Sequence, residues 1–329
     1  MATVTIRDVA SAAGVAVSTA SRALNNRGDV SESTRRRVLQ AARELDYVPN
    51  SLARGLLSGR TRTVGVIVTT ILNPFYAAVV AGIQDVLGAK GYNVVLYNSD
   101  EDQRKELAAV EALIAQRVDG IILAPVQKTP ETVELLVNRN VPFVLVGRTI
   151  LGLDTDYVVC DDIAAGQIAT EHLIRKGHRQ IMLINSSRNS SSELRYQGYA
   201  AALRANGIEV DSRLVRSVVL HTDAERAVLQ ALDEGIRPTA IFCFCDAMAL
   251  GVMRALRARG LRVPDDVALV ACDNLDFTEF LEPALTTIDV PKHEMGVKAA
   301  EVLLSKLHKH KKRTTQVVLR PSLVARAST

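Results

Sequence analysis

Residues 5–24 read TIRDVASAAGVAVSTASRAL, and their pattern predicts how the amino-terminal part of the chain folds. Thr5 followed by Asp8 is a helix-start pattern in which the two residues cap each other. The apolar residues that follow lie on one helical face. Gly14 adopts a left-handed conformation at low cost and therefore ends this helix. The pattern predicts a second helix over residues 17–24, and helix, glycine turn and helix together are typical of a helix-turn-helix.

The second predicted helix exposes small side chains and one arginine. Small residues let a helix approach a duplex closely, and an arginine can donate two hydrogen bonds to O6 and N7 of guanine in the major groove. Hydroxyl groups and backbone amides can bind phosphates and fix the register of the helix on DNA. A three-helix bundle that contacts other proteins is the alternative interpretation. The candidate DNA contacts on this helix are Val17, Ser18, Thr19, Ser21 and Arg22.

Positive charge is concentrated at the amino terminus. Residues 1–63 contain ten arginines, no lysine and five acidic residues, whereas residues 64–329 hold 30 basic and 31 acidic residues. A basic segment joined to a near-neutral body indicates a polyanionic partner for that segment. A third helix that starts at Ser31 and ends before Pro49 completes the predicted basic unit.

This region resembles the headpiece of the LacI/GalR family of repressors. The resemblance is carried by residues 5–15, then by STASRALN at 18–25, VSESTRRRV at 30–38 and LDYVPNSLAR at 45–54. It implies that bases are read by Val17, Ser18 and Arg22. It implies contacts mainly with the DNA backbone for Thr5, Thr19, Ser21, Asn25 and Ser31.

Residues 50–58 correspond to the hinge segment of that family. Gly55 costs about 1 kcal/mol inside a helix, and a helix this short is marginal alone in water. We therefore expect the segment to be disordered without DNA and helical on DNA. The resemblance implies that Leu56 enters the minor groove, where an apolar side chain kinks the duplex. The alternative is that Leu56 packs the linker onto the core. The implied DNA contacts of the segment are Asn50, Ala53, Arg54 and Leu56.

After residue 60 the chain alternates between short apolar runs and longer helical segments. Runs such as Val64–Val68 and Ile181–Asn185 read as strands, and segments such as 75–90 and 246–258 read as helices. This alternation predicts an α/β architecture of doubly wound parallel sheets, and two such series predict two lobes. In open sheets of this type, ligands bind beyond the carboxyl ends of the strands, which predicts a cleft between the lobes. We expect a helix-turn-helix domain over 1–48, a hinge over 49–60 and a core over 61–329, with an N-lobe of about 61–160 plus 291–319 and a C-lobe of about 161–290 plus 320–329.

The core resembles the periplasmic-binding-protein-like core of the same family. The resemblance is carried by Asn73-Pro-Phe-Tyr, Asp119-Gly-Ile-Ile-Leu, Leu285-Thr-Thr-Ile and Met295-Gly. It implies that a small effector, a sugar or sugar derivative, binds between the lobes. A salt-bridge network between the lobes is the alternative role of the charged residues. The implied effector-binding residues are Asn73, Phe75, Tyr76, Arg148, Arg195, Asp246, Asp273 and Phe277.

Two departures from that family limit the effector assignment. Cys245 stands where the family usually has asparagine, and the chain has no tryptophan, the residue that many sugar sites use for stacking. The serine-rich stretch 186–192 precedes a predicted helix, a setting suited to anions. With Arg148 and Arg195, this stretch raises an acidic or phosphorylated sugar as a hypothesis. A flexible polar loop is the alternative, and it is slightly favoured.

The sequence also excludes several classes of protein. It has no dinucleotide-binding or phosphate-binding glycine motif, no nucleophile elbow and no zinc-protease motif, so we expect no enzyme activity and no cofactor. Cys243 and Cys245 lack the spacing of a zinc pair, so we expect no metal. No signal or transmembrane segment is present, which predicts a cytoplasmic protein. A solute-binding protein and a sugar-modifying enzyme share the core pattern and remain the alternative functions.

The interpretation that fits these patterns is a sequence-specific transcription regulator, most simply a repressor. We expect a homodimer that binds double-stranded, pseudo-palindromic operator DNA. Lys306–Arg313 is a second basic run, and we expect it to be a solvated loop between the last long helix and the strand 316–319.

Overall fold

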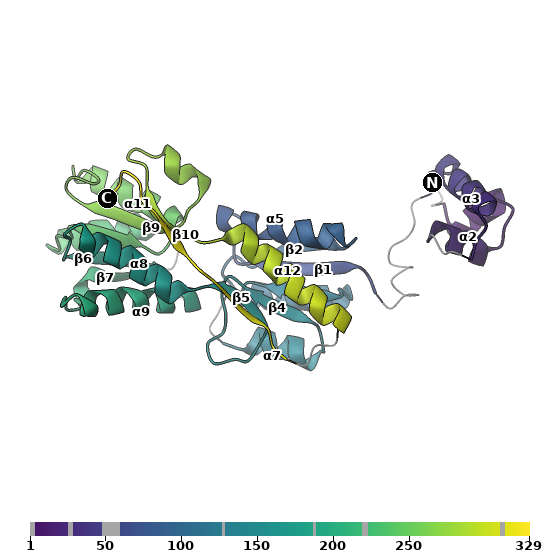
Figure 1. The fold of residues 1–329 in the computed structure, drawn as a ribbon, viewed down its shortest axis with the longest axis horizontal. Coiled ribbons are helices and arrows are strands. Elements are labelled where there is room, and N and C mark those ends of the chain that lie inside the picture. Colours follow the sequence, from purple (N-terminus) through teal and green to yellow (C-terminus); the bar gives the residue numbers. More distant parts are fainter. Residues whose placement is uncertain are drawn as a thin grey trace. The chain divides into compact units, whose positions relative to one another are not determined.

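Figure 1 shows the chain as a computed structural model, which describes residues 4–25, 29–47, 60–126, 129–186, 189–218, 223–309 and 313–329. Contacts divide the chain into two units, residues 1–61 and residues 62–329. The first unit is helical, and the second contains two six-stranded sheets. The predicted fold, amino-terminal helices followed by two parallel-sheet α/β lobes, is confirmed. Among the residues that the structure describes, every helix is too short or too polar to cross a bilayer.

The first unit is a three-helix bundle held by small side chains and helix caps. Its helices are α1 (Ile6–Ala12), α2 (Val17–Leu24) and α3 (Glu32–Glu44). The backbone amide and the hydroxyl of Thr5 both donate to Asp8 Oδ2 at 2.8 Å, which is the predicted reciprocal cap. Gly14 has a φ of +64°, which glycine adopts without steric penalty, and so turns the chain between α1 and α2. One residue of each helix is completely buried at the centre of the bundle, namely Val9, Ala20 and Val38.

The first lobe of the second unit is a parallel sheet in the order β11-β5-β4-β3-β1-β2. Its β-branched residues pack against helices on its faces, and its core is continuous with α5 and α12. The strands are β1 (Thr63–Val68), β2 (Asn93–Asn98), β3 (Gly120–Leu123), β4 (Phe143–Val146), β5 (Tyr157–Cys160) and β11 (Gln316–Leu319). The helices are α5 (Pro74–Ala89), α6 (Gln103–Ala115), α7 (Glu131–Asn138) and α12 (Lys292–Lys309).

The second lobe repeats this plan in the order β12-β10-β9-β8-β6-β7. Its strands are β6 (Ile181–Ser186), β7 (Val215–Val218), β8 (Ala240–Cys243), β9 (Ala268–Asp273), β10 (Thr286–Asp289) and β12 (Ser322–Val324). Its helices are α8 (Asp162–Arg175), α9 (Ser190–Ala205), α10 (Ala224–Asp233) and α11 (Asp246–Ala258), with short 3₁₀ turns η1 (Ser212–Leu214) and η3 (Asp276–Phe280).

One edge strand departs from the predicted parallel pattern. β12 pairs with β10 in the antiparallel direction. The chain leaves β11 at the carboxyl end of the first sheet and reaches β12 after only Arg320 and Pro321, with no helix between them. Because no helix returns the chain to the amino ends of the second sheet, β12 enters that sheet from its carboxyl side.

Each lobe has a pair of helices that touch through glycine. In the first lobe, a Cβ on Gly82 of α5 would lie 2.2 Å from the carbonyl oxygen of His293 on α12. A Cβ on Gly296 of α12 would lie 2.0 Å from the carbonyl oxygen of Val79. Real Cβ atoms do not approach this closely, so both positions require glycine at this helix separation.

The second lobe repeats this reciprocal contact between α8 and α9. A Cβ on Gly166 would lie 2.2 Å from the carbonyl oxygen of Arg195, and a Cβ on Gly198 would lie 2.0 Å from the carbonyl oxygen of Ile163. Figure 1 shows these two helices side by side along the second lobe. The packing therefore fixes the position of Arg195 relative to α8.

The expectation of a solvated loop at Lys306–Arg313 is wrong for the start of that run. Helix α12 continues to Lys309, so the first residues are helical. Lys306 Nζ lies 2.5 Å from Asp156 Oδ2 and 5.0 Å from the ring centre of Phe143. The Lys306 side chain lies over Phe143, and its ammonium group pairs with Asp156. The basic composition of the run did not reveal this ion pair.

Candidate functional site

Helix α2 turns Ala20, Ala23 and Leu24 towards the bundle, and part of its opposite surface faces solvent. Ala20 and Ala23 are buried, while Val17 is 44% exposed and Ser18 and Arg22 are also accessible. The three residues predicted to read bases therefore share one accessible face of a short helix. This arrangement can enter a major groove.

Arg22 has a partner that the sequence did not reveal. Its guanidinium lies 3.2 Å from Asp29 Oδ2, and both side chains are more than half exposed. An exposed ion pair contributes only about 0–1 kcal/mol. Phosphates and base edges can therefore displace Asp29 at little cost. Asp29 lies beyond the end of α2, so no helical spacing pointed to this pair.

Several predicted backbone contacts also stabilise the headpiece itself. Thr5 caps α1, and Ser31 Oγ accepts from a backbone amide in the first turn of α3 at 3.3 Å. Asn25 Nδ2 donates to the carbonyl oxygen of Ser21 at 2.8 Å, and Thr19 is half-buried on α2. The predicted hinge contacts lie outside the described residues, namely Asn50, Ala53, Arg54 and Leu56.

In the first lobe, the predicted effector residues follow the carboxyl ends of β1 and β4. Asn73 Oδ1 accepts from the backbone N of Phe75 at 3.0 Å and so caps α5. The rings of Phe75 and Tyr76 make an edge-to-face contact with centres 5.1 Å apart. Burial raises the pKa of Tyr76, and the nearby charge of Arg148 opposes this rise. The structure thus brings Tyr76 and Arg148 together.

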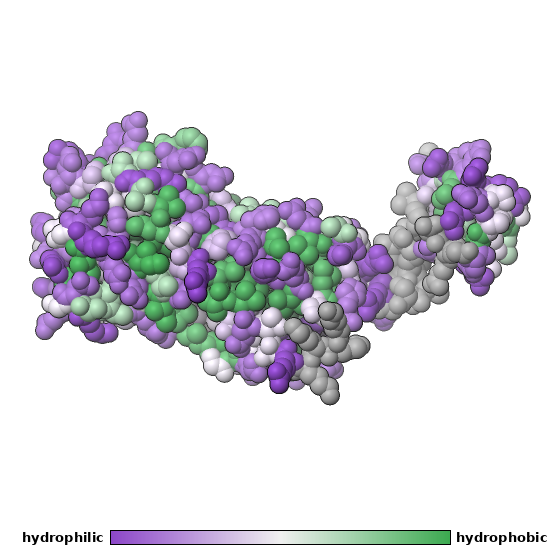
Figure 2. Space-filling model, viewed as in Figure 1, coloured by the Kyte–Doolittle hydropathy of each residue, from purple (hydrophilic) through white to green (hydrophobic). Residues whose placement is uncertain are grey.

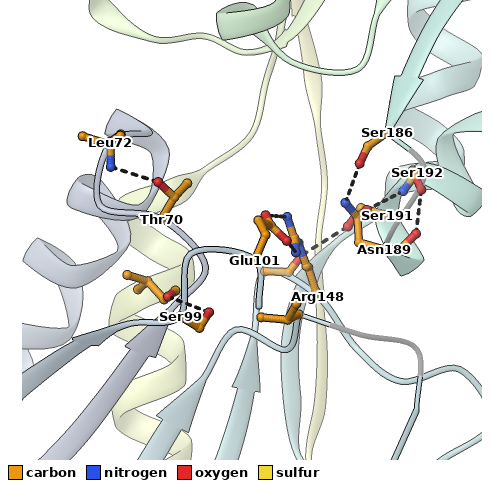
Figure 3. Close-up of polar contacts among 12 residues, drawn as sticks. Thr70, Leu72, Ser99, Glu101, Arg148, Ser186, Asn189, Ser191 and Ser192 are labelled. Atoms are coloured by element: carbon orange, nitrogen blue, oxygen red, sulfur yellow. Dashed lines mark hydrogen bonds and ion pairs between the residues drawn. The ribbon is translucent and has the colours of Figure 1, made fainter. Parts of the chain in front are cut away.

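Arg148 is held by a carboxylate that the sequence analysis missed. Its Nη1 and Nη2 donate to the two carboxylate oxygens of Glu101 at 2.9 and 2.7 Å (Figure 3). Both side chains are largely buried. Glu101 follows β2 and Arg148 follows β4, so the shared edge of the sheet joins residues that are far apart in sequence.

Arg195 has the corresponding arrangement in the second lobe. Its Nε donates to Asp162 Oδ1 at 2.8 Å, its Nη1 donates to the carbonyl oxygen of Phe244, and its guanidinium lies 4.5 Å from the centre of the Phe244 ring. Asp162 was not predicted. Arg195 and Arg148 are each paired within their own lobe, so these two residues do not form the network between lobes that was the alternative interpretation.

Asp246 is completely buried and has a structural role. Its Oδ1 accepts from Thr287 Oγ1 at 2.6 Å, and its Oδ2 accepts from the backbone N of Leu275 at 2.8 Å. Burial raises its pKa, and these two hydrogen bonds oppose the rise. Asp246 therefore ties α11 to β10 and to the turn that follows β9.

Asp273 is the last residue of β9 and has an unusual backbone conformation. Its φ is +118°, and Asn274 follows with a φ of +52°. Lys292 Nζ, from the first residue of α12, donates to the carbonyl oxygens of Asp273 and Asn274 at 2.6 and 2.9 Å. Burial raises the pKa of Asp273, and the charge of Arg195 opposes the rise. Phe277 follows on η3 and packs against the core of the first lobe.

The serine-rich stretch joins the two lobes. Thr149 N donates to Ser190 Oγ at 3.2 Å, and Ser191 Oγ donates to the carbonyl oxygen of Gly147 at 3.3 Å (Figure 3). Ser192 N donates to Asn189 Oδ1 at 2.8 Å and so completes the cap of α9. These hydroxyls are buried and already engaged, which weakens the hypothesis of an anion site at this helix end.

Comparison with known proteins identifies both units. Residues 5–50 match the family model "Bacterial regulatory proteins, lacI family". Residues 61–326 match "Periplasmic binding proteins and sugar binding domain of LacI family". The chain belongs to the LacI family. It is a DNA-binding transcription regulator with an effector-binding core, which confirms the main functional prediction over the two alternatives.

Members of the LacI family match this chain over almost its whole length. The ribose operon repressor of Escherichia coli K12 is 34% identical over 98% of this chain and 99% of its own length. Catabolite control protein A of Priestia megaterium is 37% identical over 93% of each chain. The lac repressor dimer bound to operator and the anti-inducer ONPF has a TM-score of 0.89 at 30% identity, covering 100% of this chain and 99% of that chain. The CelR–cellobiose complex has a TM-score of 0.77 at 34% identity, covering 99% and 100%.

Proposed function

We propose that this LacI-family regulator is a homodimeric repressor that binds a pseudo-palindromic operator. A neutral sugar that binds between the lobes lowers or raises the affinity for this operator. The exposed face of α2 carries the proposal, because Val17, Ser18 and Arg22 are displayed there without burial. The hinge contacts Asn50, Ala53, Arg54 and Leu56 belong to the same proposal. The proposal assigns residues 1–48 to the helix-turn-helix domain, 49–60 to the hinge and 61–329 to the core.

Exposed apolar side chains support a dimer. Leu72 is 81% exposed and Phe280 is 78% exposed, and Ile71, Leu96 and Leu250 are also exposed. Apolar surface, green in Figure 2, lies between polar areas on the viewed face of the core. Large apolar side chains that face water favour association with a partner. The related lac repressor structure is a dimer, which supports a second copy of this chain as that partner.

The charges near the predicted effector residues favour a neutral ligand. Arg148 and Arg195 already form ion pairs with Glu101 and Asp162, so neither offers an uncompensated positive charge. Asp273 adds a carboxyl group that can form hydrogen bonds with hydroxyl groups and that, when ionised, would repel a phosphate. We therefore favour a neutral, hydroxyl-rich effector over the anionic one. The cellobiose bound by the related CelR belongs to this class.

The mechanism couples the lobes to the headpieces. Two headpieces of a dimer would place their α2 helices in successive major grooves, which requires a particular spacing between them. The proposed effector contacts would favour one lobe arrangement. They are Asn73, Phe75, Tyr76 and Arg148 on one lobe and Arg195, Asp246, Asp273 and Phe277 on the other. The coupling is reciprocal, so DNA changes effector affinity by the same factor.

Selection of bound sequences from random duplex DNA tests the proposal. The full chain should enrich a two-fold symmetric site, and a panel of neutral sugars should contain one that changes affinity for that site. Recovery of sequences without any common motif would reject the operator proposal. We also infer that the protein works in the cytoplasm, where its DNA partner lies, and that it catalyses no reaction, as its relatives are transcription regulators.

A further inference from the structure

The six strands of the first sheet run parallel, so their amino ends lie along one edge. The chain enters the core at this edge, because Arg62 directly precedes β1. The linker from the headpiece therefore joins the core at this edge. We call four of the cations that precede its strands the amino-edge cations: Arg62, Lys90, Arg139 and Arg313.

The amino-edge cations come from separate connections. Lys90 is the C-cap of α5 before β2, Arg139 is the C-cap of α7 before β4, and Arg313 precedes β11. Arg62 Nη1 lies beside Gly91, where an added Cβ would be 3.2 Å away, so Arg62 adjoins Lys90. Within the described part of the core, none of the four forms an ion pair.

The carboxylates along the same edge are already engaged. Asp156 Oδ2 lies 2.5 Å from Lys306 Nζ, and Asp119 Oδ2 accepts from the backbone N of Arg62 at 3.1 Å. Asp154 Oδ1 accepts from the hydroxyl of Thr314 at 2.8 Å. These acidic groups hold the edge together without closing ion pairs to the amino-edge cations.

The corresponding edge of the second sheet is arranged differently. Arg213, before β7, is paired with Asp211 at 2.8 Å. Arg259, before β9, is paired with Asp233 at 2.5 Å. The first lobe thus leaves these four cations without an ion pair at its strand ends, whereas the second lobe pairs two of its own, Arg213 and Arg259.

We propose that the amino-edge cations bind phosphates of the same duplex that the headpieces hold. This inference rests on the proposed function, since the headpieces bind the duplex and their linkers join the core at this edge. Phosphate contacts carry no sequence information, so the edge would raise the affinity for operator and random DNA by the same factor. Sequence discrimination would stay with α2.

The test compares two variants of the full chain that each lose three positive charges. The first carries Lys90→Gln, Arg139→Gln and Arg313→Gln; Arg62 is kept because it adjoins the hinge. The control carries Arg175→Gln, Arg204→Gln and Arg257→Gln, three exposed arginines near the ends of second-lobe helices. Lys90 and Arg139 in the first set, and all three arginines of the control, lie at or near helix carboxyl ends, so any loss of stability should be similar; thermal unfolding checks this.

The readout is the dependence of DNA affinity on potassium chloride, measured by fluorescence anisotropy with a selected operator duplex and a random duplex. The slope of log affinity against log salt should become shallower by about 0.9 for each phosphate that the variant no longer neutralises. The first variant should show this change on both duplexes, and the control variant should not. Equal slopes in the two variants would overturn the inference. Wild-type binding without sequence preference, but with a shallower slope in the first variant, would reject the proposed function and keep the phosphate contact.

Discussion

Gly166→Ala tests whether the contact between α8 and α9 sets the geometry of the effector site. The added Cβ would lie 2.2 Å from the carbonyl oxygen of Arg195, which is backbone and cannot rotate away. The helices must separate by roughly 1 Å to restore an ordinary contact, and overpacking of this kind costs about 1–3 kcal/mol. Because Asp162 is on α8 and Arg195 is on α9, the same shift stretches their 2.8 Å ion pair.

Gly88→Ala is the matched control. Gly88 is also helical, on α5, but an added Cβ there would meet no atom within 4 Å. Alanine should therefore stabilise the helix by up to about 1 kcal/mol. Both substitutions add one methyl group, but they should change the free energy of unfolding in opposite directions.

Thermal unfolding and effector titration provide the assay. A loss of 1 kcal/mol lowers Tm by roughly 2–4 °C in a domain of this size, so Gly166→Ala should lower Tm by several degrees, while Gly88→Ala should raise it slightly. Gly166→Ala should also weaken binding of the neutral sugar identified by screening. A Tm for Gly166→Ala equal to or above that of Gly88→Ala would refute the steric reasoning.

Three further predictions concern the headpiece, the hinge and pH. Arg22→Ala should reduce discrimination between operator and random DNA by about 1–3 kcal/mol, measured as a ratio of affinities; an unchanged ratio would contradict direct base reading. Leu56→Ala, at a position outside the described residues, should reduce DNA bending and weaken operator binding, and an unchanged bend angle in a gel-mobility assay would reject the wedge. Burial raises the pKa of Asp273, so the folded protein holds its proton more tightly than the unfolded chain, and stability should fall as pH rises above the carboxyl's usual pKa. Asp273→Asn should flatten that decline in thermal unfolding measured from pH 5 to 8; a decline as steep as in the wild type would show that another group causes it.

Local sequence signals predicted the headpiece closely. The Thr5–Asp8 cap, the turn at Gly14 and the apolar spacing placed α2 at residues 17–24, where the structure has it. These features depend on contacts within a few residues, so one sequence contains all the information they need. The alternation of apolar runs also predicted the two α/β lobes, because buried parallel strands must be apolar on both faces.

The partners of the predicted site residues could not be found in the same way. Glu101 is 47 residues before Arg148, and Asp162 is 33 residues before Arg195. The order of strands brings Glu101 to Arg148, and the packing of α8 on α9 brings Asp162 to Arg195. No local pattern encodes either arrangement. The hydrogen-bond partners of Asp246 were missed for the same reason, since they lie 29 and 41 residues further along the chain.

The decisive experiment measures the affinity of the chain for a selected operator with and without the neutral sugar that stabilises the protein. The account predicts a change of about 5-fold to 150-fold in affinity, accompanied by the same factor in sugar affinity when operator is present. A sugar that binds tightly but leaves operator affinity unchanged would contradict the claim that the two-lobed core regulates the headpiece.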